Sequence, residues 1–186
     1  MRIADPKPNP VTEPAKSSGF NFTVWVAQGF GIGRVPKAPG TFGTLLGFPL
    51  FALLIWRGEL STLIVGCAAA TLISVWFCGE AEKILKLRDP GSIVIDEIIA
   101  IPICYIGWAA WLSVKQEEAL TVSYFFVERW PTLIGIFILF RIFDILKPWP
   151  VKGSQKMRGG WGVTIDDVLA AVYVNIVILP FLFFWP

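Results

Sequence analysis

The chain has 186 residues, of which 55% are hydrophobic and 16% are charged, and its formal net charge is +2. This length suits one domain, but the hydrophobic share is too high for an ordinary soluble protein and indicates a membrane domain. The small net charge gives no sign of a nucleic-acid partner. The absence of histidine excludes mechanisms that need a phosphohistidine, a histidine base or an imidazole metal ligand.

The N-terminal segment, residues 1–19, is polar and rich in proline and lacks the apolar core of a signal peptide. We predict that it is a disordered tail and that residues 20–186 form a single membrane-embedded domain. That domain opens with a short aromatic segment, residues 20–30.

The next segment, GIGRVPKAPGTFGT, is dense in glycine and proline and is predicted to be a loop. Where this loop meets the following helix, free backbone amides and the helix dipole would suit a phosphate, which makes binding candidates of Gly40, Thr41, Gly43 and Thr44. Glycine-rich loops are common, so this motif is weak evidence alone. It lacks the Lys-Ser/Thr ending of a nucleotide P-loop, and we expect no nucleotide ligand.

Apolar stretches follow along the rest of the chain, and several approach the ~20 residues that a helix needs to cross a bilayer. There are five of them: residues 44–56, 60–78, 93–114, 130–146 and 168–186. We therefore predict an all-α fold, a small polytopic membrane bundle of about five helices. The first stretch is short and contains Pro49, so it either takes in residues of the preceding loop or enters the bilayer only part-way.

The basic residues are unevenly distributed between the two faces of this predicted bundle. If all five stretches span, twelve of the sixteen Lys and Arg residues lie on one face. The opposite face holds Arg57, Lys115 and Arg129, and Arg141 lies within a span. By the positive-inside rule, the face with twelve basic residues is cytoplasmic.

Five acidic residues lie in apolar surroundings, where a charge costs ~2.5–3.5 kcal/mol and normally faces the bundle interior. They are Asp96, Glu97, Asp144, Asp166 and Asp167. The predicted topology puts all five at the same cytoplasmic depth, on three helices. Because carboxylate oxygens are the ligands that Mg²⁺ prefers, we predict that these acids form a catalytic metal site. Adjacent acids diverge by ~100° around a helix, so the sequence leaves open which acid of each pair is a ligand.

Other interpretations of these acids remain. Acids at helix starts are stabilised by the helix dipole, by ~0.3–1 kcal/mol each, but this does not explain Asp144 at the opposite end of its helix. Arg141 lies three residues before Asp144 on the same face, where it can pair with Asp144 or hold a substrate phosphate. A small cation or proton transporter would also use intramembrane carboxylates, although acids gathered at one interface argue against it.

Taken together, the motifs closely resemble the phosphatidylglycerophosphatase A family over about residues 29–171. The matching segments are Pro39-Gly40-Thr41-Phe42-Gly43-Thr44, Gly91-Ser92 with Asp96-Glu97, Phe140-Arg141 with Asp144, Lys147, Pro148 and Pro150, and Gly159-Gly160 with Gly162, Asp166 and Asp167. Two positions depart from the family pattern. Thr44 stands where serine is usual, and Ala171 stands where glycine is usual.

The resemblance implies Mg²⁺-dependent hydrolysis of phosphatidylglycerophosphate to phosphatidylglycerol and phosphate. It also implies a multi-pass protein of the bacterial inner (cytoplasmic) membrane, with the active site facing the cytoplasm. The metal would neutralise charge on the phosphoryl oxygens while Arg141 or Lys147 stabilises the charge that develops. No DxDx motif is present, which favours attack by water over an aspartyl phosphate. The chain could instead be an inactive subunit of a lipid-synthesis complex. The complete set of acids argues against this interpretation.

Overall fold

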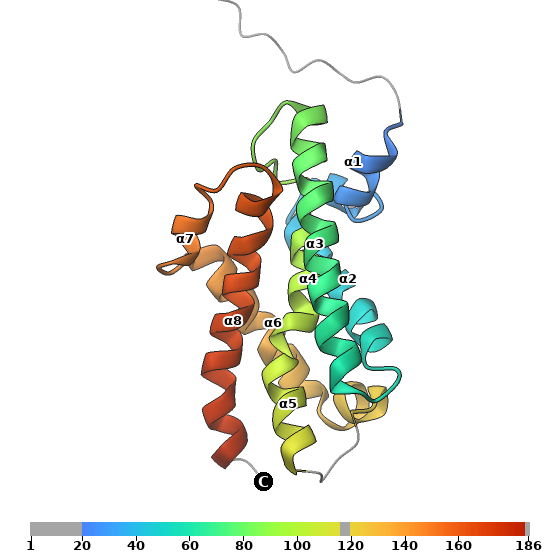
Figure 1. The fold of residues 1–186 in the computed structure, drawn as a ribbon, viewed down its shortest axis with the longest axis vertical. Helices are drawn as coiled ribbons and strands as arrows, with labels where there is room; N and C mark the ends of the chain where they lie inside the picture. The colour runs from blue at the N-terminus through green and yellow to red at the C-terminus, as the bar shows by residue number, and fades with distance from the viewer. Residues whose placement is uncertain (1–19, 116–119, 185–186) are drawn as a thin grey trace, which may run out of the picture.

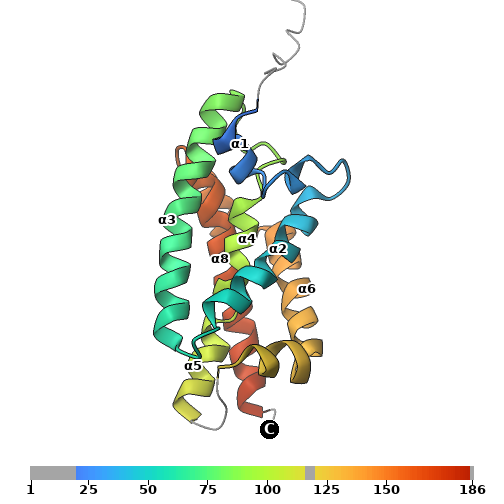
Figure 2. The ribbon, with the colours of Figure 1, turned by 90° about the vertical axis from the view of Figure 1, so that its right-hand side faces the viewer.

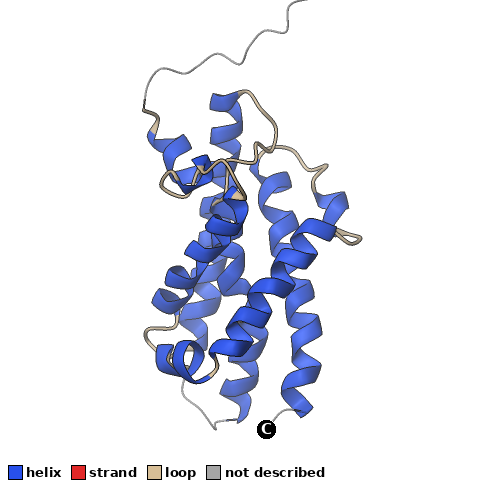
Figure 3. Ribbon diagram, turned by 180° about the vertical axis from the view of Figure 1, so that it is seen from behind, coloured by secondary structure: helices blue, strands red, loops and turns tan. Residues whose placement is uncertain are grey.

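The computed structural model describes residues 20–115 and 120–184, so the predicted N-terminal tail lies outside the described residues. These residues form helices joined by loops and contain no strand, which confirms the all-α prediction (Figure 3). In chain order the elements are α1 (Phe22–Ala27), η1 (Ile32–Arg34), α2 (Pro39–Leu54), α3 (Leu60–Leu85), α4 (Ile95–Cys104), α5 (Ile106–Lys115), the π-helical turn η2 (Tyr124–Glu128), α6 (Trp130–Leu146), α7 (Val151–Ser154) and α8 (Gly160–Phe184).

Helix α4 is the centre of the bundle. It packs against α2, α3 and α8, and all of its residues except Glu97 are buried. Figure 1 shows α3, the α4–α5 pair and α8 running side by side along the long axis. Figure 2 shows α2 and α6 on another side of α4, with η2 closing the lower end. Residues from four helices can therefore reach the same part of α4.

Within the described residues, each of the five predicted apolar stretches is mostly helical, but the helices differ in length. By length and composition, α3, the α4–α5 segment and α8 can each cross a membrane. Helices α2 and α6 have 16 and 17 residues. At ~1.5 Å per residue they are about 24 and 26 Å long, less than the ~30 Å of a bilayer core. Three spans are thus supported, and the count of five stays a prediction.

Helix α2 begins at Pro39, earlier than expected, so the predicted loop over residues 39–43 is wrong. Proline is well suited to the first helical turn, and the glycines that indicated a loop lie at a close helix contact instead. A Cβ atom added at Gly43 would lie 2.6 Å from Val94 Cβ, and one at Gly47 would lie 2.5 Å from Ile101 Cβ. Side chains at these positions would push α2 away from α4. The close packing of the two helices therefore offsets the usual cost of glycine inside a helix.

A break between α4 and α5 at Tyr105 leaves backbone groups without a helical partner, and Asn175 of α8 satisfies them. The Asn175 side chain accepts a hydrogen bond from Gly107 N at 2.7 Å and donates one to Ile103 O at 2.9 Å. Polar side chains that satisfy the backbone in this way allow a broken helix inside a membrane domain. This role explains a half-buried amide in the otherwise apolar second half of α8.

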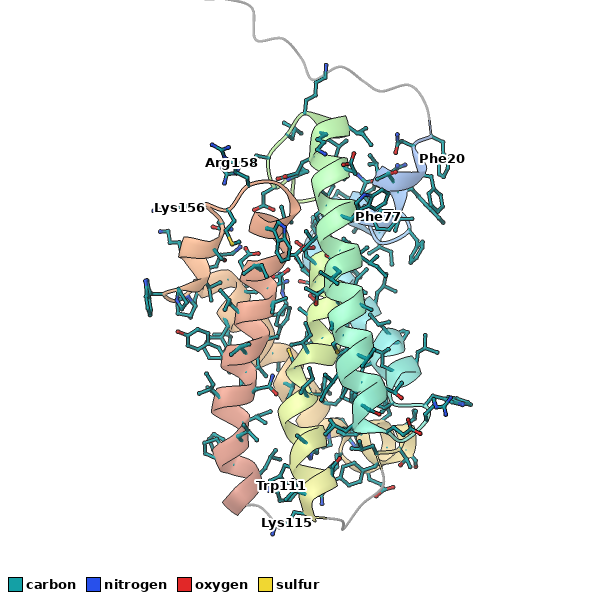
Figure 4. The ribbon with its side chains drawn as sticks, in the orientation of Figure 1. Phe20, Phe77, Trp111, Lys115, Lys156 and Arg158 are labelled. Carbon is teal, nitrogen blue, oxygen red and sulfur yellow. The ribbon has the colours of Figure 1, made fainter. Side chains whose placement is uncertain are left out.

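The two ends of the bundle differ in charge. We call the end formed by α1, the α3–α4 loop and the α7–α8 loop the loop end; Figure 4 labels Lys156 and Arg158 there, and Trp111 and Lys115 at the opposite end. Most described basic residues belong to segments near the loop end. They are Arg34, Lys37, Lys83, Lys86, Arg88, Lys147, Lys152, Lys156 and Arg158.

Candidate active site

One group of polar side chains surrounds the guanidinium of Arg141 on α6. Its Nη1 atom lies 2.7 Å from Asp144 Oδ2 and 3.0 Å from Glu97 Oε2. It also donates a hydrogen bond to Thr44 Oγ1 at 3.3 Å. Arg141 and Asp144 are three residues apart on one helix, so they share a face, and the predicted pair is confirmed. The contacts with Glu97 and Thr44 join α6 to α4 and α2.

Thr44 contributes a hydroxyl between two acceptors. Its Oγ1 lies 2.9 Å from Glu97 Oε2 and 2.8 Å from Gly40 O, and its single proton can serve only one of them at a time. A Cβ atom at Gly40 would collide with the Glu97 carboxylate. Gly40 and Gly43 therefore have a packing role at α4, while Thr41 is half-buried. The phosphate contact expected of this segment stays a prediction.

A second group of side chains meets at Asp166 on α8. Asp166 Oδ2 accepts hydrogen bonds from Lys147 Nζ at 2.6 Å and from Gln155 Nε2 at 3.1 Å. Burial alone lowers the pKa of Lys147, but the hydrogen bond and charge of Asp166, helped by Asp167 and Asp144, reverse this and leave its pKa above the ordinary value. Lys147 is therefore a cation at neutral pH.

The remaining acids, Asp96 and Asp167, are buried without a cationic partner. Their residues are 6% and 3% exposed, and neither forms an ion pair with a described Lys or Arg. Asp167 lies within electrostatic range of all four other predicted site acids: Asp96, Glu97, Asp144 and Asp166. The structure thus brings the five acids into one region. Removing a charge from water without pairing it costs several kcal/mol, on the order of the stability of a small domain.

The donors in this region suit a hard divalent cation. They are carboxylate oxygens, which Mg²⁺ prefers, and no described cation pairs with Asp96 or Asp167. In the part of the chain that the structure describes, however, no group of three acids or cysteines has the spacing of a ready metal site. The donor chemistry fits a metal, and the side chains would have to rotate to close around it.

Three polar residues near these acids were not predicted from the sequence. Gln155 lies in the α7–α8 loop, where no pattern indicated a partner. Ser74 Oγ and Thr164 Oγ1 lie 3.1 Å apart, both fully buried, and join α3 to α8 one turn before Asp167. A threonine three residues before an acid in an apolar helix is a signal that could have found Thr164, because it faces the same side of the helix.

Comparison with known proteins identifies the family. The family model described as phosphatidylglycerophosphatase A matches residues 25–182. Phosphatidylglycerophosphatase A of Haemophilus influenzae is 34% identical over 154 residues, covering 82% of this chain and 84% of that protein. Phosphatidylglycerophosphatase A of Escherichia coli is 32% identical over 149 residues, covering 79% of this chain and 76% of that protein.

A third relative, which carries a different name, has a similar sequence identity to this chain. The putative phosphatidylinositol-3-phosphatase of Bacteroides thetaiotaomicron is 35% identical over 160 residues, covering 83% of this chain and 90% of that protein. No solved structure matches the chain. The family model covers the segments that supply all the acids and basic residues described above, and the chain belongs to the phosphatidylglycerophosphatase A family.

Proposed function

We propose that this protein is a membrane lipid phosphatase that hydrolyses the terminal phosphomonoester of phosphatidylglycerophosphate, giving phosphatidylglycerol and phosphate. One observation carries the proposal: Arg141 and Lys147 lie among five acids that α4, α6 and α8 gather in one region of a membrane bundle. Two family relatives named phosphatidylglycerophosphatase A support the substrate.

Arg141 is the proposed phosphate anchor. Its three contacts with Asp144, Glu97 and Thr44 all use Nη1, so no described residue occupies Nε or Nη2, and these can bind two phosphoryl oxygens. Because the acceptors of Nη1 come from three helices, the guanidinium plane is held before substrate arrives. Such fixed donors stabilise developing charge without reorganisation.

Lys147 is the second proposed cation. It follows the last residue of α6 and donates a hydrogen bond to Asp166. We propose that its ammonium turns from Asp166 to the phosphate when the substrate binds, while Gln155 keeps its hydrogen bond to the same Asp166 oxygen. One cation would then be rigid and the other able to follow the transferred phosphoryl group.

The uncompensated acids are the proposed metal ligands. Asp96 and Asp167 would hold Mg²⁺, with Glu97, Asp144 and Asp166 as the candidates to complete the set after side-chain rotation. A divalent cation there supplies Lewis-acid neutralisation of the phosphoryl charge. We propose direct attack by water rather than an aspartyl phosphate, because the sequence has no DxDx motif.

We further propose that the loop end faces the cytoplasm of the bacterial inner membrane, because most described basic residues belong to that end. The alternative, transport of a cation or proton, would need polar groups along a path through the bundle. The site acids instead occupy the first turn of α4, the last turn of α6 and the second turn of α8.

The test is phosphate release from phosphatidylglycerophosphate in detergent micelles by purified protein, with Mg²⁺ or a chelator, beside Asp96→Asn. We expect release that needs Mg²⁺ and is lost in the variant. Phosphatidylinositol 3-phosphate, tested in parallel, separates the two substrates named for the relatives. Folded protein that releases no phosphate from either lipid would reject the phosphatase and leave cation transport to be tested.

A further inference from the structure

A polar cleft opens at the loop end beside the site. It has a volume of about 470 Å³ and lies between the end of α3, the α3–α4 loop and the α7–α8 loop. Its charged lining residues are Arg88, Lys152 and Lys156 on the positive side and Glu82 and Asp89 on the negative side. Figure 4 shows Lys156 projecting from this end of the bundle.

The charges in the cleft are not equally available to a ligand. Glu82 Oε1 accepts a hydrogen bond from Asp89 N at 2.7 Å, so one acid is committed to the loop itself. Arg88 Nη2 donates to the backbone oxygen of Gln155 at 2.5 Å. Lys152 and Lys156 form no ion pair with any residue that the structure describes. The three cations and two acids of the lining give the cleft a net charge of +1, which favours an anion.

Gln155 connects this cleft to the proposed reaction site. It lines the cleft, and its side-chain amide donates to Asp166 Oδ2, the same oxygen that Lys147 Nζ contacts. Because both nitrogens touch one oxygen, at 2.6 and 3.1 Å, they lie within about 6 Å of each other. The cleft and the cation proposed to bind the reacting phosphate are therefore separated by a single carboxylate.

We propose that this cleft is a second phosphate site, which binds the phosphodiester of the substrate while the phosphomonoester lies at Arg141 and Lys147. The inference rests on the proposed function. The substrate carries two phosphates joined by a three-carbon glycerol, so two neighbouring sites for anions match its head group. The lipids in both names given to the relatives combine a phosphodiester with a phosphomonoester.

The phosphodiester also gives a basis for discrimination between lipids. The phosphodiester is attached to diacylglycerol, whose chains hold it at the head-group level of the bilayer. The cleft lies at the loop end, where the charged loops meet. Recognition of the diester would distinguish the substrate from phosphatidic acid, which carries a phosphomonoester directly on diacylglycerol and has no diester.

The test compares phosphatidylglycerophosphate with phosphatidic acid in the double variant Lys152→Ala/Lys156→Ala. Phosphatidic acid is measured both as substrate and as competitor, so that slow turnover still yields an affinity. Arg158→Ala is the matched control, because Arg158 is an exposed basic residue of the same loop that does not line the cleft. Inhibition by inorganic phosphate is measured in every variant.

We expect the double variant to raise KM for phosphatidylglycerophosphate about tenfold with kcat nearly unchanged, since it removes the two ammonium groups proposed to contact the diester. The affinity for phosphatidic acid should stay the same, and Arg158→Ala should shift neither lipid. Equal shifts for both lipids, or no shift for either, would overturn the proposal. A change confined to inhibition by inorganic phosphate would assign the cleft to the released product instead. Failure of the proposed function would already show as no release by the unmodified protein.

Discussion

The acids of the site fall into two groups that burial does not distinguish. Glu97 and Asp144 share Arg141, and Asp166 has Lys147, whereas Asp96 and Asp167 have no described cation. Yet Asp96, Asp144, Asp166 and Asp167 are all buried. A paired acid holds helices together, while an unpaired buried acid opposes folding. The unpaired acids are therefore the ones whose retention calls for a function, and the comparison can be tested by changing one member of each group.

The largest expected effect is on activity, at an unpaired acid. Asp167→Asn should lower phosphate release by about 10³-fold, as expected when a principal electrostatic contribution to a transition state is lost. The same change should leave the thermal stability of the metal-free protein unchanged or higher, because it removes a buried charge that has no partner. Phosphate release and thermal unfolding in detergent measure the two effects.

The matched change at a paired acid is Glu97→Gln. It leaves Arg141 with one carboxylate partner instead of two, so we expect lower thermal stability together with lower activity. If Asp167→Asn and Glu97→Gln lowered stability equally, the division into paired and unpaired acids would be wrong.

The next largest effect is expected on stability, at Arg141, the cation that Glu97 and Asp144 share. Arg141→Ala leaves Glu97 and Asp144 without a cationic partner, and we expect a loss of about 3 kcal/mol, the lower end for a broken buried pair because the site is partly exposed. Arg141→Lys should recover part of the stability but little activity, since an ammonium lacks the planar fork that can bind two oxygens.

Thermal unfolding of both variants beside the unmodified protein measures this difference. Normal stability in Arg141→Ala would show that the three helices do not depend on the guanidinium. Full activity in Arg141→Lys would show that a point charge is enough at the phosphate.

Sequence alone predicted the parts of this site that follow from local order. The long apolar runs predicted the helices, and acids near helix ends predicted that Asp96, Asp144 and Asp166 share one level. The i,i+3 spacing predicted the Arg141–Asp144 pair. These inferences succeed because helix geometry and the cost of charge in lipid act on neighbouring residues.

The rest depends on contacts between distant segments. Glycines around Gly43 indicated a loop because isolated helices disfavour glycine, but packing against Val94 overrides that preference. The break at Tyr105 lies inside a run that reads as one helix, so the role of Asn175 had no sequence signal. Gln155 reaches Asp166 only because the α7–α8 loop folds back onto α8.

A smaller effect should come from Mg²⁺ itself. If Asp96 and Asp167 hold the cation, saturating Mg²⁺ should stabilise the folded protein by about 2.7 kcal/mol at a hundred times its dissociation constant. Asp96→Asn/Asp167→Asn should lose this stabilisation, while Lys147→Met, which removes the partner of Asp166, should keep it. Thermal unfolding with and without Mg²⁺ measures it without any turnover. Equal stabilisation of the double variant would place the metal elsewhere.

The smallest effect is expected at Thr44, the hydroxyl between the paired acid Glu97 and Arg141. Thr44→Ser keeps the oxygen that both residues contact, so stability and activity should stay close to those of the unmodified protein. Thr44→Val has nearly the same shape but removes a hydrogen bond to a charged group, and we expect a loss of about 1.5 kcal/mol, the lower end for such a bond because Glu97 keeps Arg141. Thermal unfolding of the two variants in parallel separates the hydroxyl from the volume of the side chain. A Thr44→Val protein as stable as Thr44→Ser would mean that Arg141 alone compensates the Glu97 carboxylate, and the paired group would then depend on one residue rather than on a network.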